Sequence, residues 1–273
     1  MKYKLTDETM TTESGIVLHR IECVTAFSDV KVGEKGGWIE KEENLSQYNN
    51  CWVYENACVF GDACVFGNAR VCENARVCEN ARVCENARVY ENARVYGNSR
   101  VHGNALVCGD ARVFGNSVVC GDALVFGNAC VFGNSCVCEN ARVYGDACVF
   151  GNSRVHGDAL VCGDACVFGN SRVCENACVY GDACVFGNAR VFGDAILCGD
   201  AIIKNGNDYI VFKNKWSSGR YFTWTRSNDM WKVGYFYGTG KELIEKAYKD
   251  SKLSGDCYKA YVELVDKLKE IQK

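Results

Sequence analysis

Histidine and cysteine are the side chains best suited to catalysis or metal binding in this chain of 273 residues, which has three histidines and 20 cysteines. Four of them recur at one constant interval along the chain: His102, Cys120, Cys138 and His156. Cys136 lies two positions before Cys138. Thiolate and imidazole bind soft metals such as zinc. Ligands arranged in a straight column approximate a tetrahedron poorly, however, and we therefore predict no metal site.

The two histidines of this column occur in matching phrases, Ser99–Gly103 and Ser153–Gly157. The two phrases are 54 residues apart, which is three times the 18-residue interval of the column. Internal duplication therefore explains the pair better than a catalytic role does. The third histidine, His19, lies outside the duplicated region. We predict no catalytic residue and no cofactor.

These side chains are positioned by one six-residue phrase that repeats from Cys51 to Asp200 in 25 uninterrupted copies. Ala93–Asn98, with the sequence Ala-Arg-Val-Tyr-Gly-Asn, is typical. The third position is Val in 24 copies, the fifth is Gly or Glu, and the sixth is Asn or Asp. A short fixed period of this kind predicts a solenoid. Three phrases make an 18-residue coil that closes a triangle, and parallel coils stack about 4.8 Å apart.

The second position of the phrase decides which face points inward, because it is Arg in 11 of the 25 copies. Burying an unpaired Arg in coil after coil would be prohibitively costly. Positions two and four must therefore point outward, and the Ala and Val of positions one and three fill the core. The seven Glu residues at position five suit an exposed corner.

One outward column carries aromatic residues on successive coils. Its phenylalanines are Phe114, Phe132, Phe150, Phe168 and Phe186. The neighbouring outward column is mainly Cys over the same coils. At about 4.8 Å a coil the strip is roughly 20 Å long, and some hundreds of Å² of apolar surface approach the limit that a monomer tolerates. We predict that these phenylalanines form an interface for a second copy or for another protein.

The spacing of an aliphatic residue and a small residue four positions later, as in Val95/Ser99 and Val101/Ala105, resembles the hexapeptide repeat of left-handed β-helices. The resemblance implies a mainly β fold, a single-stranded left-handed parallel β-helix. Hexapeptide acyltransferases use a His on the solenoid and a long loop that leaves one corner. The repeat from Cys51 to Asp200 has no such loop. The missing loop favours a non-enzymatic scaffold, and an acyltransferase with an acyl-coenzyme A slot between subunits is the alternative.

Residues 1–50 lack the repeat, and we predict an N-terminal β cap there, followed by the β-helix over 51–203. Gly36 and Gly37 are expected to interrupt the strand pattern, and Trp38-Ile39 offers an apolar plug. The expected strands are Lys2–Leu5, Ile16–Cys23 and Val30–Val32.

Residues 204–273 form a distinct basic unit with 14 basic and 9 acidic residues. The Thr239–Glu242 capping box predicts a helix to about Ser251. Gly255 is expected to end it, and a second helix follows over about Asp256–Ile271. The expected strands of this β-β-β-α-α unit are Tyr209–Asn214, Arg220–Arg226 and Trp231–Tyr237.

Cations lie beside aromatic residues in this unit, at Trp224, Arg226, Trp231 and Lys232. Such a mixture can stack on and neutralise a nucleotide or a nucleic acid. In the other interpretation, which we favour, the aromatic residues are the core of the unit and the cations its solvated face.

The two ends of the chain resemble uncharacterised hexapeptide-repeat proteins carried by phages and prophages. The resemblance rests on Gly36–Glu40, Glu43–Ser46 and Cys51–Tyr54 at one end and on Tyr221–Asn228 and Phe236–Gly240 at the other. It implies a viral accessory protein. We therefore expect a non-enzymatic β-solenoid scaffold that binds a host macromolecule, such as a host-defence protein that it inhibits, or that assembles into a homo-oligomer.

Neither a charged-then-apolar signal pattern nor an apolar run long enough to span a membrane occurs in the sequence. We therefore expect a cytoplasmic protein without membrane contact. If a phage encodes it, the compartment would be the cytoplasm of the host cell. Of the 20 cysteines, 17 occupy outward positions of the repeat, where they replace Arg, Leu, Phe or Tyr. We expect them to be reduced thiols rather than a disulfide framework.

Overall fold

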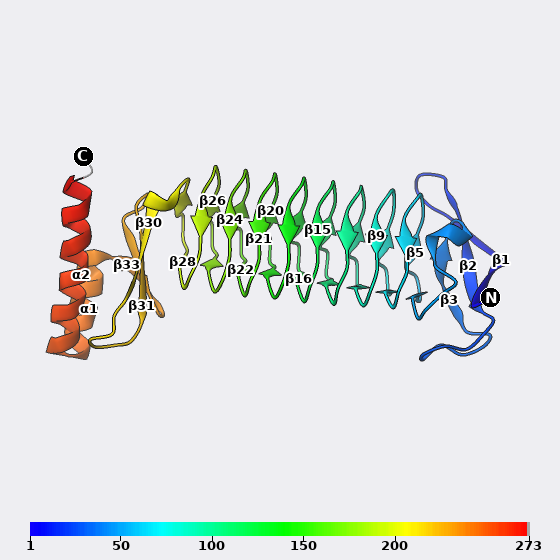
Figure 1. Cartoon of the computed structure of the whole chain (residues 1–273), viewed down its shortest axis with the longest axis horizontal. Helices are drawn as coiled ribbons and strands as arrows, with labels where there is room; N and C mark the ends of the chain where they lie inside the picture. Colours follow the sequence, from blue (N-terminus) through cyan, green and yellow to red (C-terminus); the bar gives the residue numbers. More distant parts are fainter. Residues whose placement is uncertain (272–273) are drawn as a thin grey trace.

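The computed structural model describes residues 1–271, which form an elongated rod (Figure 1). A parallel β-solenoid makes up the middle of the rod, three strands cover its N-terminal end, and an antiparallel sheet with two helices covers the other end. Each strand of the solenoid pairs with the equivalent strand of the next coil, as Cys130 does with Cys148. The predicted fold class, a mainly β solenoid of 18-residue coils, is confirmed.

The solenoid has three faces, built from two-residue strands at positions two and three of each phrase. The first face contains β5 (Cys58–Val59), β8 (Arg76–Val77), β11 (Arg94–Val95), β14 (Arg112–Val113), β17 (Cys130–Val131), β20 (Cys148–Val149), β23 (Cys166–Val167), β26 (Cys184–Val185) and β29 (Ile202–Ile203). The second contains β6 (Cys64–Val65), β9 (Arg82–Val83), β12 (Arg100–Val101), β15 (Val118–Val119), β18 (Cys136–Val137), β21 (Arg154–Val155), β24 (Arg172–Val173) and β27 (Arg190–Val191). The third contains β4 (Trp52–Val53), β7 (Arg70–Val71), β10 (Arg88–Val89), β13 (Leu106–Val107), β16 (Leu124–Val125), β19 (Arg142–Val143), β22 (Leu160–Val161), β25 (Cys178–Val179) and β28 (Ile196–Leu197).

The core of the solenoid is a prism of small and β-branched side chains. Ala129 and Val131 are completely buried, whereas Arg112 at an outward position is exposed. The same alternation holds along the repeat, as its sequence predicts. Stacking identical Val side chains on successive coils fills the narrow interior without large voids.

The corners of the triangle lie at position five, where the backbone adopts positive φ. Gly133 has φ 76° and Glu139 has φ 62°, a conformation that is costly for a residue with a side chain. The Glu139 carboxylate accepts a hydrogen bond from the Gly157 N–H of the next coil at 2.7 Å. Four further glutamates make the same contact: Glu79, Glu85, Glu91 and Glu175. These side chains therefore connect successive coils instead of being merely solvated.

The N-terminal cap consists of β1 (Tyr3–Thr11), β2 (Val17–Cys23), β3 (Lys35–Ile39) and the short helix η1 (Glu42–Asn44). β3 pairs in parallel with β5, so the cap extends the first face. The expectation that Gly36 and Gly37 interrupt the strand pattern is wrong, because both lie within β3. A Cβ on Gly36 would come within 2.7 Å of the Trp52 ring, so glycine permits this close approach.

Two further expectations for the cap are corrected. Residues 30–32 form no strand, although Val30 makes an isolated bridge with Phe27. Trp38 is only half-buried, with the Arg20 guanidinium 4.9 Å from its ring centroid. The buried plug is Trp52 instead, which Tyr3 and Phe27 contact edge-on.

The C-terminal unit is a four-stranded sheet that lies between the end of the solenoid and two helices (Figure 1). Its elements are η2 (Gly206–Asp208), β30 (Tyr209–Lys213), β31 (Tyr221–Thr225), β32 (Met230–Val233), β33 (Phe236–Thr239), α1 (Gly240–Asp250) and α2 (Lys252–Ile271). The predicted third strand is thus two strands, separated by a turn at Gly234 with φ 55°. Within the described part of the chain, neither helix is long and apolar enough to cross a membrane.

Gly255 lies inside α2 rather than at its start, which corrects the expected helix boundary. The break between the helices falls at Ser251, whose backbone is extended. A Cβ on Gly255 would collide with the Tyr248 ring. The glycine therefore serves the close packing of α2 on α1.

Side chains of the C-terminal unit pair with the exposed backbone of the last coil. The Tyr209 hydroxyl donates to the Arg190 carbonyl of β27 at 2.9 Å. The Ile196 N–H of β28 donates to the Thr223 hydroxyl at 2.9 Å, and the Ile202 N–H of β29 donates to the Ser227 hydroxyl at 2.7 Å. Each face thus ends on a hydrogen-bonded partner, which blocks edge-to-edge aggregation.

Candidate functional site

The most regular outward feature of the solenoid is a ladder of parallel aromatic rings on the first face. The Phe132 and Phe150 ring centroids are 4.9 Å apart, and the ring planes differ by 2°. The same centroid spacing continues through the whole set, with ring planes within 5° of parallel, over Tyr96, Phe114, Phe132, Phe150, Phe168 and Phe186. In-register parallel strands impose one rotamer on every ring. We call the ladder and the cysteines beside it the phenylalanine face.

From Phe132 to Phe186 the phenylalanine face carries no charged outward residue. Arg94 and Arg112 flank its first two rings, Tyr96 and Phe114, and the Lys204 ammonium lies 5.7 Å from the Phe186 ring centroid at the other end. Four cysteine thiols next to the rings donate to the carbonyl two residues before each, at 3.7 to 3.8 Å: Cys130, Cys148, Cys166 and Cys184. The strip of half-buried rings and thiols is therefore flat and apolar.

The two edges of the phenylalanine face differ in charge. One edge is an amide ladder, in which the Asn134 amide donates to Asn152 at 3.0 Å and Asn152 donates to Asn170 at 3.1 Å. The other edge carries carboxylates on consecutive coils: Asp146, Asp164, Asp182 and Asp200. A neutral edge and an acidic edge thus flank the rings.

Buried serines fix the backbone beneath the rings. The Ser135 hydroxyl donates to the Phe132 carbonyl at 2.9 Å and to the Val149 carbonyl at 3.3 Å. All five serines of the repeat lie in this one column: Ser99, Ser117, Ser135, Ser153 and Ser171. Each serine donates a hydrogen bond to the backbone carbonyl of the ring residue three positions before it, and so helps to hold that residue in place.

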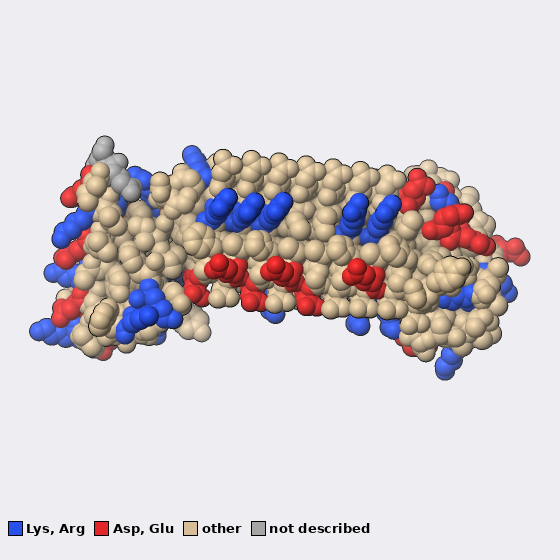
Figure 2. Space-filling view, viewed as in Figure 1, with Lys and Arg blue, Asp and Glu red and all other residues tan. Residues whose placement is uncertain are grey.

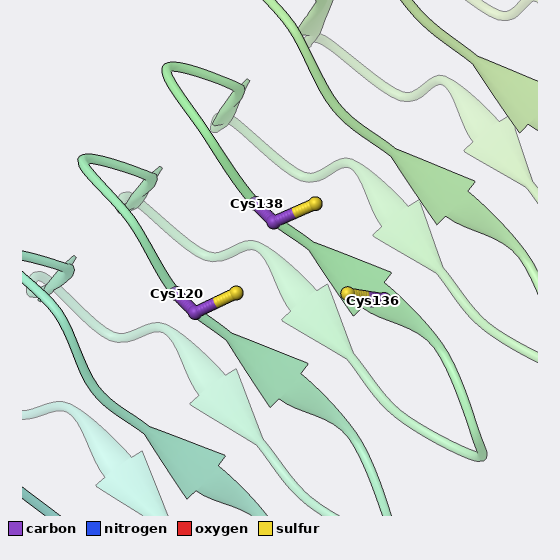
Figure 3. A group of neighbouring side chains, drawn as sticks. All are labelled: Cys120, Cys136 and Cys138. Carbon is purple, nitrogen blue, oxygen red and sulfur yellow. The ribbon is translucent and has the colours of Figure 1, made fainter.

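The column of histidines and cysteines on the second face does not act as one group. The His102 Nδ1 lies 4.0 Å from the Glu85 carboxylate, and the His156 Nδ1 lies 3.9 Å from that of Glu139. The structure brings together three thiols instead: Cys120, Cys136 and Cys138 (Figure 3).

Hydrogen bonding within this thiol cluster changes its acidity. Hydrogen bonds from Cys138 and Cys120 and the nearby Arg154 charge lower the pKa of Cys136 to about 7, against the opposing effect of burial. The hydrogen bond to Cys136 and burial raise the pKa of Cys138. Sequence reasoning placed Cys136 beside the column without using it. The available signal was that 135–140 is the single copy of the phrase with Cys at both outward positions.

The C-terminal residues proposed to bind nucleotides are not arranged for stacking. Trp224 and Trp231 are only 3% and 2% exposed, in a core that also contains Leu243 and Val262 of the helices. This burial agrees with the favoured interpretation, in which these two rings belong to the core of the unit. The Lys232 ammonium lies 5.6 Å from the Tyr180 ring of the solenoid. Arg226 is exposed in the turn after β31, where its N–H donates to the Asp208 carbonyl.

Comparison with known proteins supports the class of protein that the fold defines, a hexapeptide-type β-helix protein. The family described as the YdcK β-solenoid repeat matches residues 87–103, 105–121 and 141–157. The uncharacterised acetyltransferase YdcK of Escherichia coli (strain K12) is 36% identical over 59 residues, which are 19% of this chain and 18% of that protein. The chain thus matches less than a fifth of the length of this curated relative.

Proposed function

We propose that this protein is a non-enzymatic β-solenoid scaffold that assembles through its phenylalanine face. The observation that supports the proposal most strongly is the unbroken stack from Phe114 to Phe186, with 4.9 Å between ring centroids. Apolar strips of this size on a protein surface mark contact sites. A rigid, flat strip also loses little side-chain entropy when it is covered.

The occupant that fits this face best is a second copy of the chain. A twofold pair brings the same patch of both subunits together, so the patch must complement itself. With the two rods parallel, the acidic edge at Asp164 of one copy lies along the amide edge at Asn152 of the other. With the rods antiparallel, acidic edge meets acidic edge. Charge therefore favours the parallel pair.

A finer proposal is that the protein is a phage accessory protein and that a host macromolecule, such as a defence protein, covers the same face. Its support is the resemblance of residues 36–54 and 221–240 to phage-carried repeat proteins. In this version the face binds a foreign apolar surface, and self-association is replaced by capture of the host partner.

The test compares two triple variants with the same number of Phe-to-Ser changes. F132S/F150S/F168S removes the centre of the ladder. F66S/F126S/F192S removes three outward phenylalanines from the other two faces and serves as the matched control. Both variants should keep the far-UV circular dichroism of the parent, because these side chains point outward. Only the ladder variant should lose association in chemical cross-linking.

Equal cross-linking yields for the parent and the ladder variant would contradict the proposal. If the parent is monomeric, a pull-down from host lysate with the same two variants tests the finer version. In that case the ladder variant should lose a specific host protein that the control variant retains.

The second candidate function is acetyl transfer, and the observation that favours it is the printed name of the Escherichia coli relative. The residues available for it are His102 and His156, each beside a glutamate carboxylate. Acetyl-coenzyme A should then bind to the parent in calorimetry and be consumed with an amine or hydroxyl acceptor. H102A/H156A should abolish turnover. No binding of acetyl-coenzyme A would exclude this candidate.

A further inference from the structure

The three thiols on the second face come from two neighbouring coils. Cys120 follows β15, while Cys136 opens β18 and Cys138 follows it. Figure 3 shows the Cys120 and Cys138 sulfurs pointing the same way and the Cys136 sulfur turned toward them. The three Sγ atoms all lie within 4.8 Å of one another. Cys120 and Cys138 belong to the straight column that the sequence suggested, and Cys136 completes a triangle with them.

The other cysteine columns have a different arrangement. The thiols of Cys148 and Cys166 donate to the backbone carbonyls of Asp146 and Asp164, at 3.7 Å in each case. The Cys136 thiol lies beside the thiols of both Cys120 and Cys138, so three sulfurs from two strand columns meet at one place. Three mutually adjacent thiols can share one ion, whereas the thiols of one in-register column form a line in which only successive pairs are neighbours.

Charges of both signs surround the triangle, because a guanidinium borders it and the Glu85 and Glu139 carboxylates are near enough to act on its thiols. In Figure 2 the row of basic side chains along the second face is interrupted near the middle of the rod. The sequence of that column explains the gap, because Val118 and Cys136 replace Arg between Arg100 and Arg154. Arg154 is the strand neighbour of Cys136, so a guanidinium borders the thiols directly.

We propose that Cys120, Cys136 and Cys138 bind one thiophilic metal ion through their three sulfurs. Metal–sulfur bonds of about 2.3 Å place the sulfurs roughly 4 Å apart around one ion, so small rotations about χ1 complete the site. Soft thiolate ligands select Zn(II) or Cu(I) over hard cations. Three protein ligands leave a fourth position open to solvent for Zn(II), and Cu(I) is complete with three. The site is on a different face from the phenylalanine ladder and is independent of its function.

The experiment titrates the reduced full-length chain with Zn(II) alone or with Cu(I) alone, against a competing chelator. C136S breaks the triangle but leaves the straight column. C148S/C166S/C184S removes three thiols of the first face and is the matched control. Far-UV circular dichroism should be the same for all, since every substituted side chain points outward.

C136S should lower the affinity for the most tightly bound metal ion by more than about 100-fold, because losing even an outer-sphere partner of a metal ligand lowers metal affinity about 10- to 100-fold. The control should bind like the parent. X-ray absorption of the loaded parent should show three sulfur neighbours, with one oxygen or nitrogen neighbour more for Zn(II) than for Cu(I). Equal affinities of C136S and the control, or a shell dominated by oxygen and nitrogen, would overturn the proposal.

Discussion

The Phe132 and Phe150 rings lie 4.9 Å apart and within 2° of parallel, although a full coil of the chain separates them in sequence. Their stacking follows directly from the strand register, since Cys130 pairs with Cys148 and Val131 with Val149. Residues of the same type that recur once per coil in the sequence therefore become direct neighbours on the surface. This relation converts a sequence period into a continuous apolar strip.

The Glu139 carboxylate should stabilise the stacking of its coil on the next. Glu139→Ala removes the hydrogen bond to Gly157, and we expect a loss of about 1 kcal/mol because the group is largely exposed. Glu139→Gly removes the same bond but relieves the positive φ, which offsets about 1 kcal/mol. In chemical denaturation, the parent and the glycine variant should thus have similar free energies of unfolding, and the alanine variant a lower one. A glycine variant less stable than the alanine variant would contradict this explanation.

Thr223 should hold the last coil against the C-terminal sheet through the Ile196 N–H. Thr223→Val leaves that N–H without its acceptor at a buried position, which costs about 1 to 3 kcal/mol. Thr223→Ser keeps the oxygen and is the control. Amide hydrogen exchange at Ile196 should accelerate in the valine variant only. Unchanged exchange there would show that Thr223 does not secure the coil.

The start of α1 should respond to acid. Hydrogen bonds from the Thr239 N–H and hydroxyl lower the pKa of Glu242 below its usual value of 4.5. A pKa lowered by folding stabilises the fold above the unfolded pKa, and this contribution is lost as the pH falls through the folded pKa. Exchange protection in α1 should therefore decline below about pH 4.5. E242Q should lack this step, and an identical decline in E242Q would assign it to another group.

The cysteines should titrate as free thiols. All 20 are free in the structure, and in-register neighbours on parallel strands point the same way. Such a geometry disfavours the perpendicular dihedral of a disulfide. A thiol reagent applied to denatured protein that was purified without reductant should react with nearly 20 thiols per chain. A count below half of that would mean that the columns are cross-linked.

The solenoid could be predicted from the sequence because its period is unbroken and Arg at position two excludes burial of that face. The same reasoning placed Phe114 to Phe186 in one column. The serines could have been assigned to the same corner by counting whole coils, but their hydrogen bonds to the Phe carbonyls required the backbone geometry.

The ends were predicted less well, because single glycines there serve packing instead of turns. Gly36 admits the Trp52 ring and Gly255 admits the Tyr248 ring, contacts between segments that no local pattern encodes. For Trp224 and Trp231 the sequence left a ligand contact and a core position open while favouring the core, and the packing of the two helices on these rings agrees with the core position. The thiol triangle could not be predicted from the sequence, because it depends on the direction in which the Cys136 side chain points.

Sedimentation velocity over a wide range of protein concentration tests the central claim most directly. The parent should shift from the sedimentation coefficient of one rod to that of a pair as concentration rises. F132S/F150S/F168S should remain a single rod throughout, and F66S/F126S/F192S should follow the parent. A ladder variant that pairs with the affinity of the parent would show that the stacked rings are surface structure and not the interface.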